Sequence, residues 1–509
     1  MTVAELIDNH AALGDHLAYA LGGASTGGYG SPERPGTTLS YAQLAEVTRP
    51  WRRLATEPLR NHRAVLQIAD PLRFAVAFLG LMAGGATVVP LDPNAPEHER
   101  RHLVDLLGGD VLVSDRPPQR TEALVPVWPV GEGGAAPADP EPVASTPRRA
   151  PLSPHPALIL SSSGTTGAPK VIPLQERQLL YVAGKVAEHH HLNGNERGYN
   201  PLPLFHVNAE VVGLLSTLVA GSSLVMDPKF RRTGFWDLVD HWDVTWINAV
   251  PAVLAILARS DPPSPEVARR IRFARSASAP LPIPVLEAFE AHTGIPIVET
   301  YGMTEAAAQI TANPIPPQPH RPGSPGLPVG VEVRVVDAQG KVCSQGTVGA
   351  VEIKGKSVIE HYLTPGEEER LRPARERSGW LRTGDIGHFD ADGYLFLAGR
   401  ADDVINRGGE KVYPRPIEDV LRLSSDVEEV AVIGQPDSIL GQCPVAYVIP
   451  TAAADPERLE ADLQRLAGSR LAPPHRPVAY HWRQTLPAGP TGKVSRKKLR
   501  DLVDQEAGA

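Results

Sequence analysis

A run of small and hydroxyl-bearing residues directly follows a short apolar segment in the first half of the chain. It consists of Ser161, Ser162, Ser163, Gly164, Thr165, Thr166, Gly167, Ala168, Pro169 and Lys170. Small residues let backbone amides approach an anion closely, and clustered hydroxyl groups donate hydrogen bonds to phosphate oxygens. The run differs from a Walker P-loop, in which Lys and Ser or Thr directly follow the last glycine. A flexible polar turn is the alternative interpretation, but we favour a loop that binds phosphate.

Further unusual segments follow in a set order along the chain. They are Pro-Leu-Phe-His at 203–206, Glu-Thr-Tyr-Gly-Met-Thr-Glu at 299–305, Gly-Trp-Leu-Arg-Thr-Gly-Asp at 379–385, Gly-Arg-Ala-Asp-Asp at 399–403 and Pro-Thr-Gly-Lys at 490–493. With the hydroxyl-rich run, this set resembles the adenylate-forming superfamily, which includes acyl-CoA synthetases, firefly luciferases and the adenylation domains of peptide synthetases. The resemblance covers nearly the whole chain. Residues 227–230, 235–237 and 246–251 look most similar to the branch that holds the oxalate–CoA and coumarate–CoA ligases.

The resemblance implies a two-step reaction that uses ATP, Mg²⁺ and coenzyme A. A carboxylate is joined to the α-phosphate of ATP, pyrophosphate leaves, and the acyl group then passes to a thiol. Because two anions must meet, positioning and neutralisation of charge should supply most of the catalysis. The implied fold is α/β: a large N-terminal domain at 1–399 has parallel sheets covered by helices and a small antiparallel β subdomain. A small mobile α+β domain at 400–509 follows it.

The resemblance also assigns the residues that hold the nucleotide. Thr304 matches the hydroxyl at the α-phosphate, and Glu305 matches the carboxylate that holds Mg²⁺, a hard cation that prefers oxygen ligands. Asp385 matches the acceptor of both ribose hydroxyls, and Arg400 the contact to ribose and phosphate. The implied walls around adenine are Ser278, Ala279, Glu299, Thr300, Tyr301 and Gly302. Taken singly, Glu305 could be an acid at a helix N-terminus and Asp385 a turn cap.

The C-terminal motif implies a catalytic lysine on a domain that turns between the two half-reactions. Lys493 matches the amine that bridges the carboxylate and the α-phosphate, and Asp402 matches the hinge. The turn would withdraw Lys493 and bring Gly408 and Gly409 to the site. Glycines there would let the thin pantetheine arm of coenzyme A pass the backbone.

His206 matches the histidine beside the acyl site that affects access of the carboxylate. The candidate acid pocket is lined, by position, by Val207, Asn208, Gly213, Val250, Ser276, Gly302 and Ala308. Peptide-synthetase domains carry an aspartate for the α-amine just after the position of His206, and this chain lacks it. Ala308 also stands near the place where the oxalate branch has a histidine for the second carboxylate. We therefore expect a mostly apolar pocket with one amide, suited to a short or medium fatty, unsaturated or aryl acid.

The elements that must position these residues alternate in type. Short apolar strands are expected at 64–68, 110–113, 157–160, 245–250 and 295–298, with helical stretches between them, as in βαβ units of a covered parallel sheet. Residues 331–336 and 349–353 alternate apolar and polar, which is typical of half-exposed antiparallel strands. Residues 74–91 carry no charge, and their glycines, Pro90 and β-branched end favour a buried helix, a turn and a strand over a membrane helix.

Composition sets the class of protein. The 509 residues include 50 Lys and Arg against 58 Asp and Glu, which argues against a nucleic-acid or anionic-membrane binder. Two cysteines, no signal-peptide pattern and no Ser-Lys-Leu ending favour a cytoplasmic, reducing setting. We expect an acid–CoA ligase for a small carboxylic acid. An enzyme that loads an acyl carrier protein or an amine remains the close alternative. Retention of the site residues argues against a non-catalytic relative.

Overall fold

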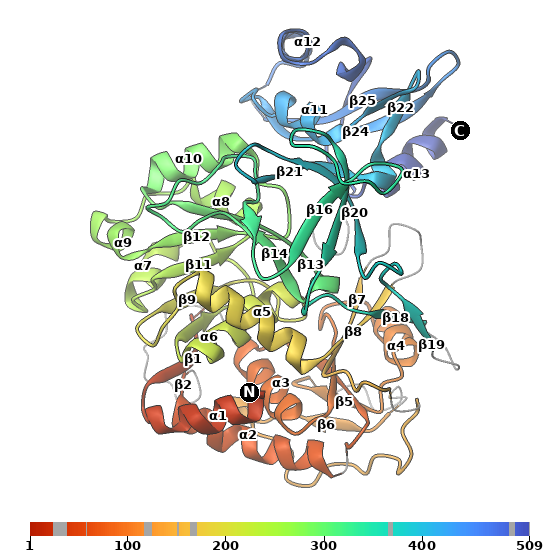
Figure 1. Ribbon diagram of the computed structural model, residues 1–509. Helices are drawn as coiled ribbons and strands as arrows, with labels where there is room; N and C mark the ends of the chain where they lie inside the picture. Colours follow the sequence, from red (N-terminus) through yellow and green to blue (C-terminus); the bar gives the residue numbers. More distant parts are fainter. Residues whose placement is uncertain are drawn as a thin grey trace.

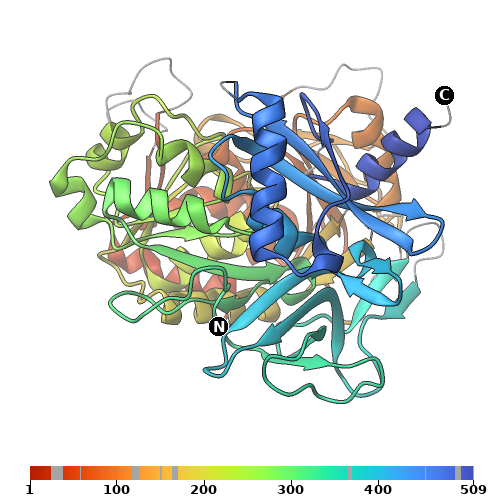
Figure 2. The same ribbon diagram turned by 90° about the horizontal axis from the view of Figure 1, so that it is seen from above.

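The computed structural model describes residues 1–23, 38–57, 59–116, 125–149, 152–162, 170–364, 370–452, 454–487 and 494–507. Two large sheets with their helices form the body of the molecule, and a smaller unit formed by the C-terminal part of the chain sits on top of it (Figure 1). A small antiparallel sheet lies beside this junction. The view from above in Figure 2 shows the C-terminal unit, in blue, lying across the body.

The eight-stranded sheet contains the two described ends of the hydroxyl-rich run, Ser161 with Ser162, and Lys170. In spatial order its strands are β19 (Arg370–Pro373), β18 (His361–Thr364), β8 (Lys170–Leu174), β7 (Leu158–Ser162), β4 (Thr87–Pro90), β3 (Arg63–Gln67), β5 (Val111–Ser114) and β6 (Val127–Pro129). The strands from β6 to β7 pair in parallel, whereas β8, β18 and β19 add antiparallel neighbours. This confirms the expected strands and their parallel pairing.

The nine-stranded sheet carries most of the candidate site residues. Its order is β15 (Leu327–Pro328), β14 (Ala308–Ala312), β13 (Ile297–Met303), β12 (Phe273–Ser276), β11 (Trp246–Ala249), β9 (Arg197–Asn200), β10 (Ser223–Met226), β1 (Leu17–Leu21) and β2 (Thr38–Ser40). Its centre, from β1 to β13, is parallel. Because ligands bind outside the carboxyl ends of parallel strands, the segments after β9, β12 and β13 form the natural site edge.

Helices cover both sheets and fill the space between them (Figure 1). They are α1 (Val3–His10), α2 (Tyr41–Thr56), α3 (Pro71–Ala83), α4 (Glu97–Leu106), α5 (Glu176–His189), α6 (Ser216–Ala220), α7 (Phe235–His241), α8 (Pro251–Leu257), α9 (Pro265–Arg270) and α10 (Ile283–Thr293), together with the π-helical segment η3 (Asn208–Leu215). The largest core cluster contains side chains from α1, α2, α3 and η3.

Helix α3 explains the uncharged stretch at 74–91. Asp70 caps it by accepting the N–H groups of Leu72 and Arg73 at 2.9 Å each, and Pro71 occupies its first turn. Nearly every residue of α3 is buried in the large core, so no polar face is needed. The chain then turns and enters β4. Among the described residues, no helix is long and apolar enough to cross a membrane.

The remaining sheets build the second wall of the site. The small antiparallel sheet has the order β16 (Glu332–Val336), β17 (Gly349–Lys354), β20 (Leu381–Phe389) and β21 (Leu395–Arg400). After a short turn, η5 (Ala401–Asp403), the chain enters the C-terminal unit. It contains β22 (Ile405–Arg407), β23 (Glu410–Val412), β24 (Val427–Asp437), β25 (Gly441–Pro450) and β26 (Ala479–Trp482), with α11 (Pro414–Leu421), α12 (Pro456–Arg470) and α13 (Arg496–Ala507). This unit has its own hydrophobic core, which contains Ile405, Ile417 and Leu459.

Candidate active site

A single cleft of about 2010 Å³ runs between the body and the C-terminal unit. The body contributes residues from the ends of its strands, among them His206, Arg275 and Glu305. The C-terminal unit contributes Arg415 from α11 and Ser495 from the segment before α13. The cleft therefore brings together residues from most of the motifs, from Lys170 to Asp403, which lie 233 residues apart in the sequence.

Asp385 and Arg400 form one side of the cleft. They are register partners on the neighbouring strands β20 and β21, and Nη1 of Arg400 donates to Oδ1 of Asp385 at 3.1 Å. The hydroxyl of Tyr301 donates to the other carboxylate oxygen. Burial, followed by the charge of Asp385, raises the pKa of Tyr301, so its hydroxyl keeps its proton. This arrangement holds a carboxylate at the cleft wall, where it can accept paired hydroxyls.

Glu305 and Tyr362 form the floor nearby. Glu305 lies in the short turn η4 (Thr304–Ala306), is only 5% exposed and accepts the Tyr362 hydroxyl at 3.1 Å. The Lys170 ammonium lies 5.3 Å from the centre of the Tyr362 ring. Thr304, Glu305, Lys170 and Tyr362 all line the cleft. Sequence reasoning missed Tyr362, because it lies 57 residues after Glu305 with no motif around it.

The residues around Glu305 suit Mg²⁺ rather than a metal held entirely by protein. Among the described residues, no group of three or more His, Cys, Asp or Glu side chains could hold a metal ion. Mg²⁺ is commonly held by one or two carboxylates together with substrate phosphates and water. A single carboxylate in the cleft lining, next in sequence to the hydroxyl-bearing Thr304, fits that pattern.

A tight crossing of backbone fixes the η4 turn. Gly302 pairs with Gln309 across β13 and β14, and a Cβ atom at Gly302 would lie 1.6 Å from the carbonyl oxygen of Ala308. Only glycine permits this approach. Ala307 and Ala308 have φ values of 56° and 109°, a backbone region that residues other than glycine rarely adopt. Such strain often accompanies functional sites, where the surrounding structure holds it in place.

The predicted adenine walls also line the cleft: Ser278, Ala279, Glu299, Thr300, Tyr301 and Gly302. Thr300 donates its hydroxyl to the carbonyl of Ser276 at 3.0 Å, which links β13 to β12. Burial raises the pKa of Glu299 to about 8, partly opposed by the charge of Arg415 on α11. Glu299 is therefore a neutral carboxyl group at pH 7 that can donate as well as accept.

Of the candidates for the acid pocket, Val207, Asn208, Val250 and Ala308 line the cleft together with His206. Two further candidates, Gly213 and Ser276, do not line it. Gly213 packs in η3 near Leu224 and Asn200, and Ser276 is 1% exposed at the end of β12. The pocket is also less apolar than the sequence suggested, because the buried Arg275 lines it and binds Asn208.

Several predicted residues lie outside the described part of the chain. These are Ser163, Gly164, Thr165, Thr166, Gly167 and Lys493. The segments that flank them are described. Ser161 and Ser162 end β7, and Lys170 begins β8 as the register partner of Ser162. On the other side, the N–H of Ser495 donates to the carbonyl of Pro487 at 2.7 Å, and Val494 and Ser495 line the cleft.

The hinge candidate Asp402 lines the cleft, whereas the glycine pair Gly408 and Gly409 does not. Asp402 lies in η5 and lines the cleft. Gly408 and Gly409, with φ values of 58° and 89°, form the two-residue turn between β22 and β23, which favours glycine because both residues have positive φ. This turn does not line the cleft.

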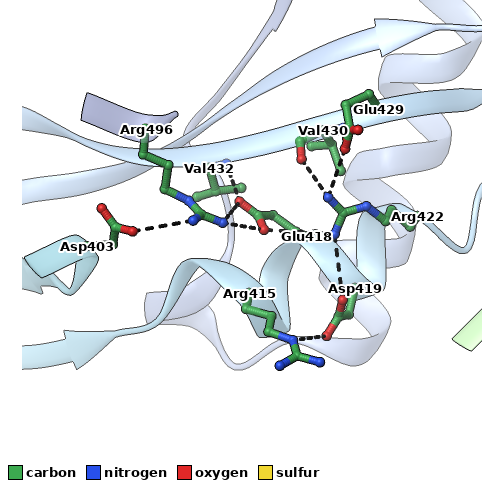
Figure 3. A network of polar contacts seen from close by, with 9 residues as sticks. All are labelled: Asp403, Arg415, Glu418, Asp419, Arg422, Glu429, Val430, Val432 and Arg496. Atoms are coloured by element: carbon green, nitrogen blue, oxygen red, sulfur yellow. Dashed lines mark hydrogen bonds and ion pairs between the residues drawn. The ribbon is translucent and has the colours of Figure 1, made fainter. Parts of the chain in front are cut away.

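A network of ion pairs and hydrogen bonds joins elements of the C-terminal unit (Figure 3). Nη2 of Arg496 donates to both carboxylate oxygens of Glu418 at 2.7 Å, and Nη1 approaches Asp403 at 3.4 Å. Glu418 also accepts the N–H of Val432 at 2.8 Å. Burial acts in the opposite direction, but Arg496 and then Arg422 lower the pKa of Glu418. The network ties η5 and the start of α13 to helix α11.

Comparisons with known proteins agree with this arrangement. The AMP-binding enzyme family model matches residues 27–363, and the AMP-binding enzyme C-terminal domain model matches residues 416–493. The chain belongs to the AMP-binding enzyme family. It is 40% identical over 359 residues to sulfoacetate–CoA ligase of Cupriavidus necator, covering 70% of this chain and 69% of the relative. It is 32% identical over 481 residues to oxalate–CoA ligase of Arabidopsis thaliana, covering 90% and 92%.

A solved structure extends the comparison. O-succinylbenzoate coenzyme A synthetase from Bacillus subtilis, in complex with ATP and magnesium ion, is 25% identical, with a TM-score of 0.80 and coverage of 97% and 99% of the two chains. The chain is an ATP-dependent acid–CoA ligase. It activates a carboxylic acid to an acyl-adenylate, with release of pyrophosphate, and transfers the acyl group to coenzyme A. The predicted α/β fold and the predicted family are confirmed.

Proposed function

We propose that the cleft activates a small organic acid by bringing its carboxylate and the α-phosphate of ATP together at Thr304 and Glu305. The observation that carries this proposal is that one cleft is lined both by His206 and by Asp385, which is hydrogen-bonded to Tyr301 and Arg400. The ribose lies at Asp385 and Arg400, adenine between residues 277–280 and 299–302, and the acid beside His206. Relatives named for sulfoacetate and oxalate support a small acid.

The phosphates and the metal use two neighbouring groups of residues. Glu305 holds Mg²⁺, while Lys170 and residues 161–167 neutralise the outer phosphates. Tyr362 orients the Glu305 carboxylate through its 3.1 Å hydrogen bond. The bound metal supplies charge neutralisation for the leaving pyrophosphate.

We further propose that 1–399 and 400–509 act as two domains that turn about Asp402. Lys493 enters the cleft for adenylation, because its neighbours Val494 and Ser495 already line it. The turn then replaces Lys493 with Gly408 and Gly409, which lie outside the cleft in this arrangement. The contacts of Arg496 with Asp403 and Glu418 tie Asp403, the residue just after the hinge, to α11 and α13, so these parts move together.

Use of an acyl carrier protein is the remaining question about the thiol acceptor. Coenzyme A is the acceptor of the ligase reaction, and we propose that it is used in preference to the phosphopantetheine arm of a carrier protein. The test is a competition assay. The purified chain is incubated with ATP, one acid from a panel of small acids, and equal concentrations of coenzyme A and a phosphopantetheinylated carrier protein. Preferential acyl-CoA formation supports the proposal, and preferential loading of the carrier contradicts it. Pyrophosphate release that does not depend on any acid would contradict the activation step.

A further inference from the structure

Arg275 is a buried cation on the acid side of the cleft with no counter-charge among the described residues. It lies on β12, is 2% exposed and lines the cleft. Its guanidinium donates to three neutral side-chain oxygens: Asn208 Oδ1 at 2.7 Å, Asn248 Oδ1 at 3.2 Å and Gln309 Oε1 at 3.1 Å. Burying a charge without an opposite charge is costly, so natural proteins rarely retain one without a use.

The charge of Arg275 persists at neutral pH. Burial lowers the pKa of the guanidinium to about 9, which is still two units above pH 7. The nearby His189 does not share or offset this charge, because burial and the neighbouring cations lower its pKa to about 4 and keep it neutral. Glu210, in η3, is not a counter-charge: burial raises its pKa well above the usual range, and neither carboxylate oxygen meets a described donor.

The neighbours of Arg275 leave several donors without acceptors. A guanidinium can only donate, so Asn208 and Gln309 must turn their carbonyl oxygens toward it and their NH₂ groups away. Among the described residues, Asn208 Nδ2 and Gln309 Nε2 meet no acceptor, and neither do Nε of Arg275 and the hydroxyl of Ser276. Two of these donors, Arg275 Nε and Asn208 Nδ2, belong to residues that line the cleft, whereas Gln309 and Ser276 do not line it. These donors lack acceptor oxygens, and the guanidinium lacks a negative counter-charge. An anion with several oxygens would supply both.

We propose that Arg275, assisted by the neighbouring Asn208, binds a second anionic group of the acid substrate, so that the enzyme is selective for small acids bearing a carboxylate or sulfonate besides the carboxylate that is activated. This inference rests on the proposed function, because it places the substrate in the same pocket. Selectivity follows from the cost of leaving a buried charge unpaired when a simple monocarboxylate binds.

The acid preference of the wild-type enzyme tests this inference without any substitution. Initial rates of pyrophosphate release are measured with sulfoacetate, malonate and oxalate, and with acetate, propionate and butyrate as matched monocarboxylates. We expect kcat/KM to be about 10- to 100-fold higher for acids with a second anionic group, the factor that a hydrogen bond to a charged group contributes. Equal or higher kcat/KM for the monocarboxylates would overturn the inference and leave the proposed function standing. No release with any acid would overturn both. Comparison of sulfoacetate with malonate and oxalate shows whether the second anionic group is a sulfonate or a carboxylate.

Two variants then assign the preference to this arginine. Arg275→Met removes the charge and keeps the apolar volume, and it should lower the ratio of diacid to monoacid kcat/KM by about 10- to 100-fold. Arg275→Lys keeps the charge without the planar fork and should restore part of the ratio. The matched control is Arg197→Met on β9 of the same sheet, where Arg197 donates to the carbonyl of Trp242 at 2.6 Å and does not line the cleft. It should leave the ratio unchanged. Equal loss toward both acid classes in Arg275→Met and Arg275→Lys would overturn the assignment.

Discussion

Asp385 and Arg400 pair across two antiparallel strands, and the same carboxylate also accepts the hydroxyl of Tyr301. The pair joins β20 to Arg400, the last residue of β21, which lies two residues before the predicted hinge Asp402. A nucleotide held at Asp385 is thus held at the junction between the body and the C-terminal unit. This relationship explains how one cleft can serve two half-reactions.

Asp385→Asn should weaken ATP binding. The amide cannot match the charge of Arg400, and it accepts hydroxyls less strongly than a carboxylate. We expect KM for ATP to rise about 10- to 100-fold, consistent with loss of a charged hydrogen bond. Steady-state pyrophosphate release at varied ATP measures this. The control is Asp392→Asn, where Asp392 pairs with Arg321 away from the cleft. An unchanged KM for ATP in Asp385→Asn would contradict the ribose assignment.

Gly302→Ala should damage both stability and adenylation. The added Cβ would lie 1.6 Å from the Ala308 carbonyl oxygen, so the backbone that holds the η4 turn must shift. We expect the free energy of unfolding to fall by about 1–3 kcal/mol, and kcat to fall with it. Urea unfolding and single-turnover adenylation measure the two effects. Gly184→Ala in α5 is the control, since a Cβ there meets nothing within 4 Å and alanine favours helix. Wild-type stability in Gly302→Ala would refute the close approach.

Glu299→Gln should change how stability depends on pH. The pKa of Glu299 is raised from 4.5 to about 8 by burial, so between these values the unfolded chain loses a proton that the folded chain keeps. Stability from this group is therefore fully present below pH 4.5 and is lost as the pH rises toward 8. The variant should lack this slope, which approaches about 1.4 kcal/mol per pH unit. Thermal unfolding from pH 5 to 8.5 measures it, with exposed Glu287→Gln as control. Parallel wild-type and Glu299→Gln curves would contradict the prediction.

Lys493→Ala should affect only the first half-reaction. The amine is proposed to bridge the carboxylate and the α-phosphate, and it leaves the cleft before thiol transfer. We expect acyl-adenylate formation to slow by about 100- to 1,000-fold, the range for loss of one preorganised electrostatic contact. Transfer of the acyl group from synthetic acyl-AMP to coenzyme A should stay near the wild-type rate. Exposed Lys341→Ala, on the small antiparallel subdomain, serves as control. Equal losses in both half-reactions would contradict the assigned role.

The elements that carry strong periodic signals could be predicted from the sequence, whereas contacts between distant elements could not. The strands around residues 64–68, 245–250 and 349–353 have clear apolar patterns, and the structure contains them. Tyr362 was missed because it reaches Glu305 only after β18 joins the edge of the eight-stranded sheet. The role of Arg275 was missed because a hydropathy pattern does not show which side chains a residue contacts in the fold. The one available signal was a lone cation in the apolar strand that leads into residues 276–280.

The description of the acid pocket changed for the same reason. From sequence, Ala308 and its neighbours indicated a pocket without charge. In the structure, Arg275 on β12 supplies a charge, and Asn208 is its partner rather than an isolated amide. Short motifs locate chemistry that is local in sequence, but specificity here depends on three segments that meet only in the folded chain.

The most direct test of the central claim follows the oxygen atoms of the acid. The enzyme is supplied with ATP, Mg²⁺, coenzyme A and its best acid labelled with ¹⁸O in the carboxylate to be activated, and the nucleotide product is examined by mass spectrometry. Attack of that carboxylate on the α-phosphate forms an acyl-adenylate, and the later transfer to the thiol leaves one carboxylate oxygen on AMP. We therefore expect AMP that carries a single ¹⁸O. Unlabelled AMP, or ADP with ¹⁸O in inorganic phosphate, would contradict the account.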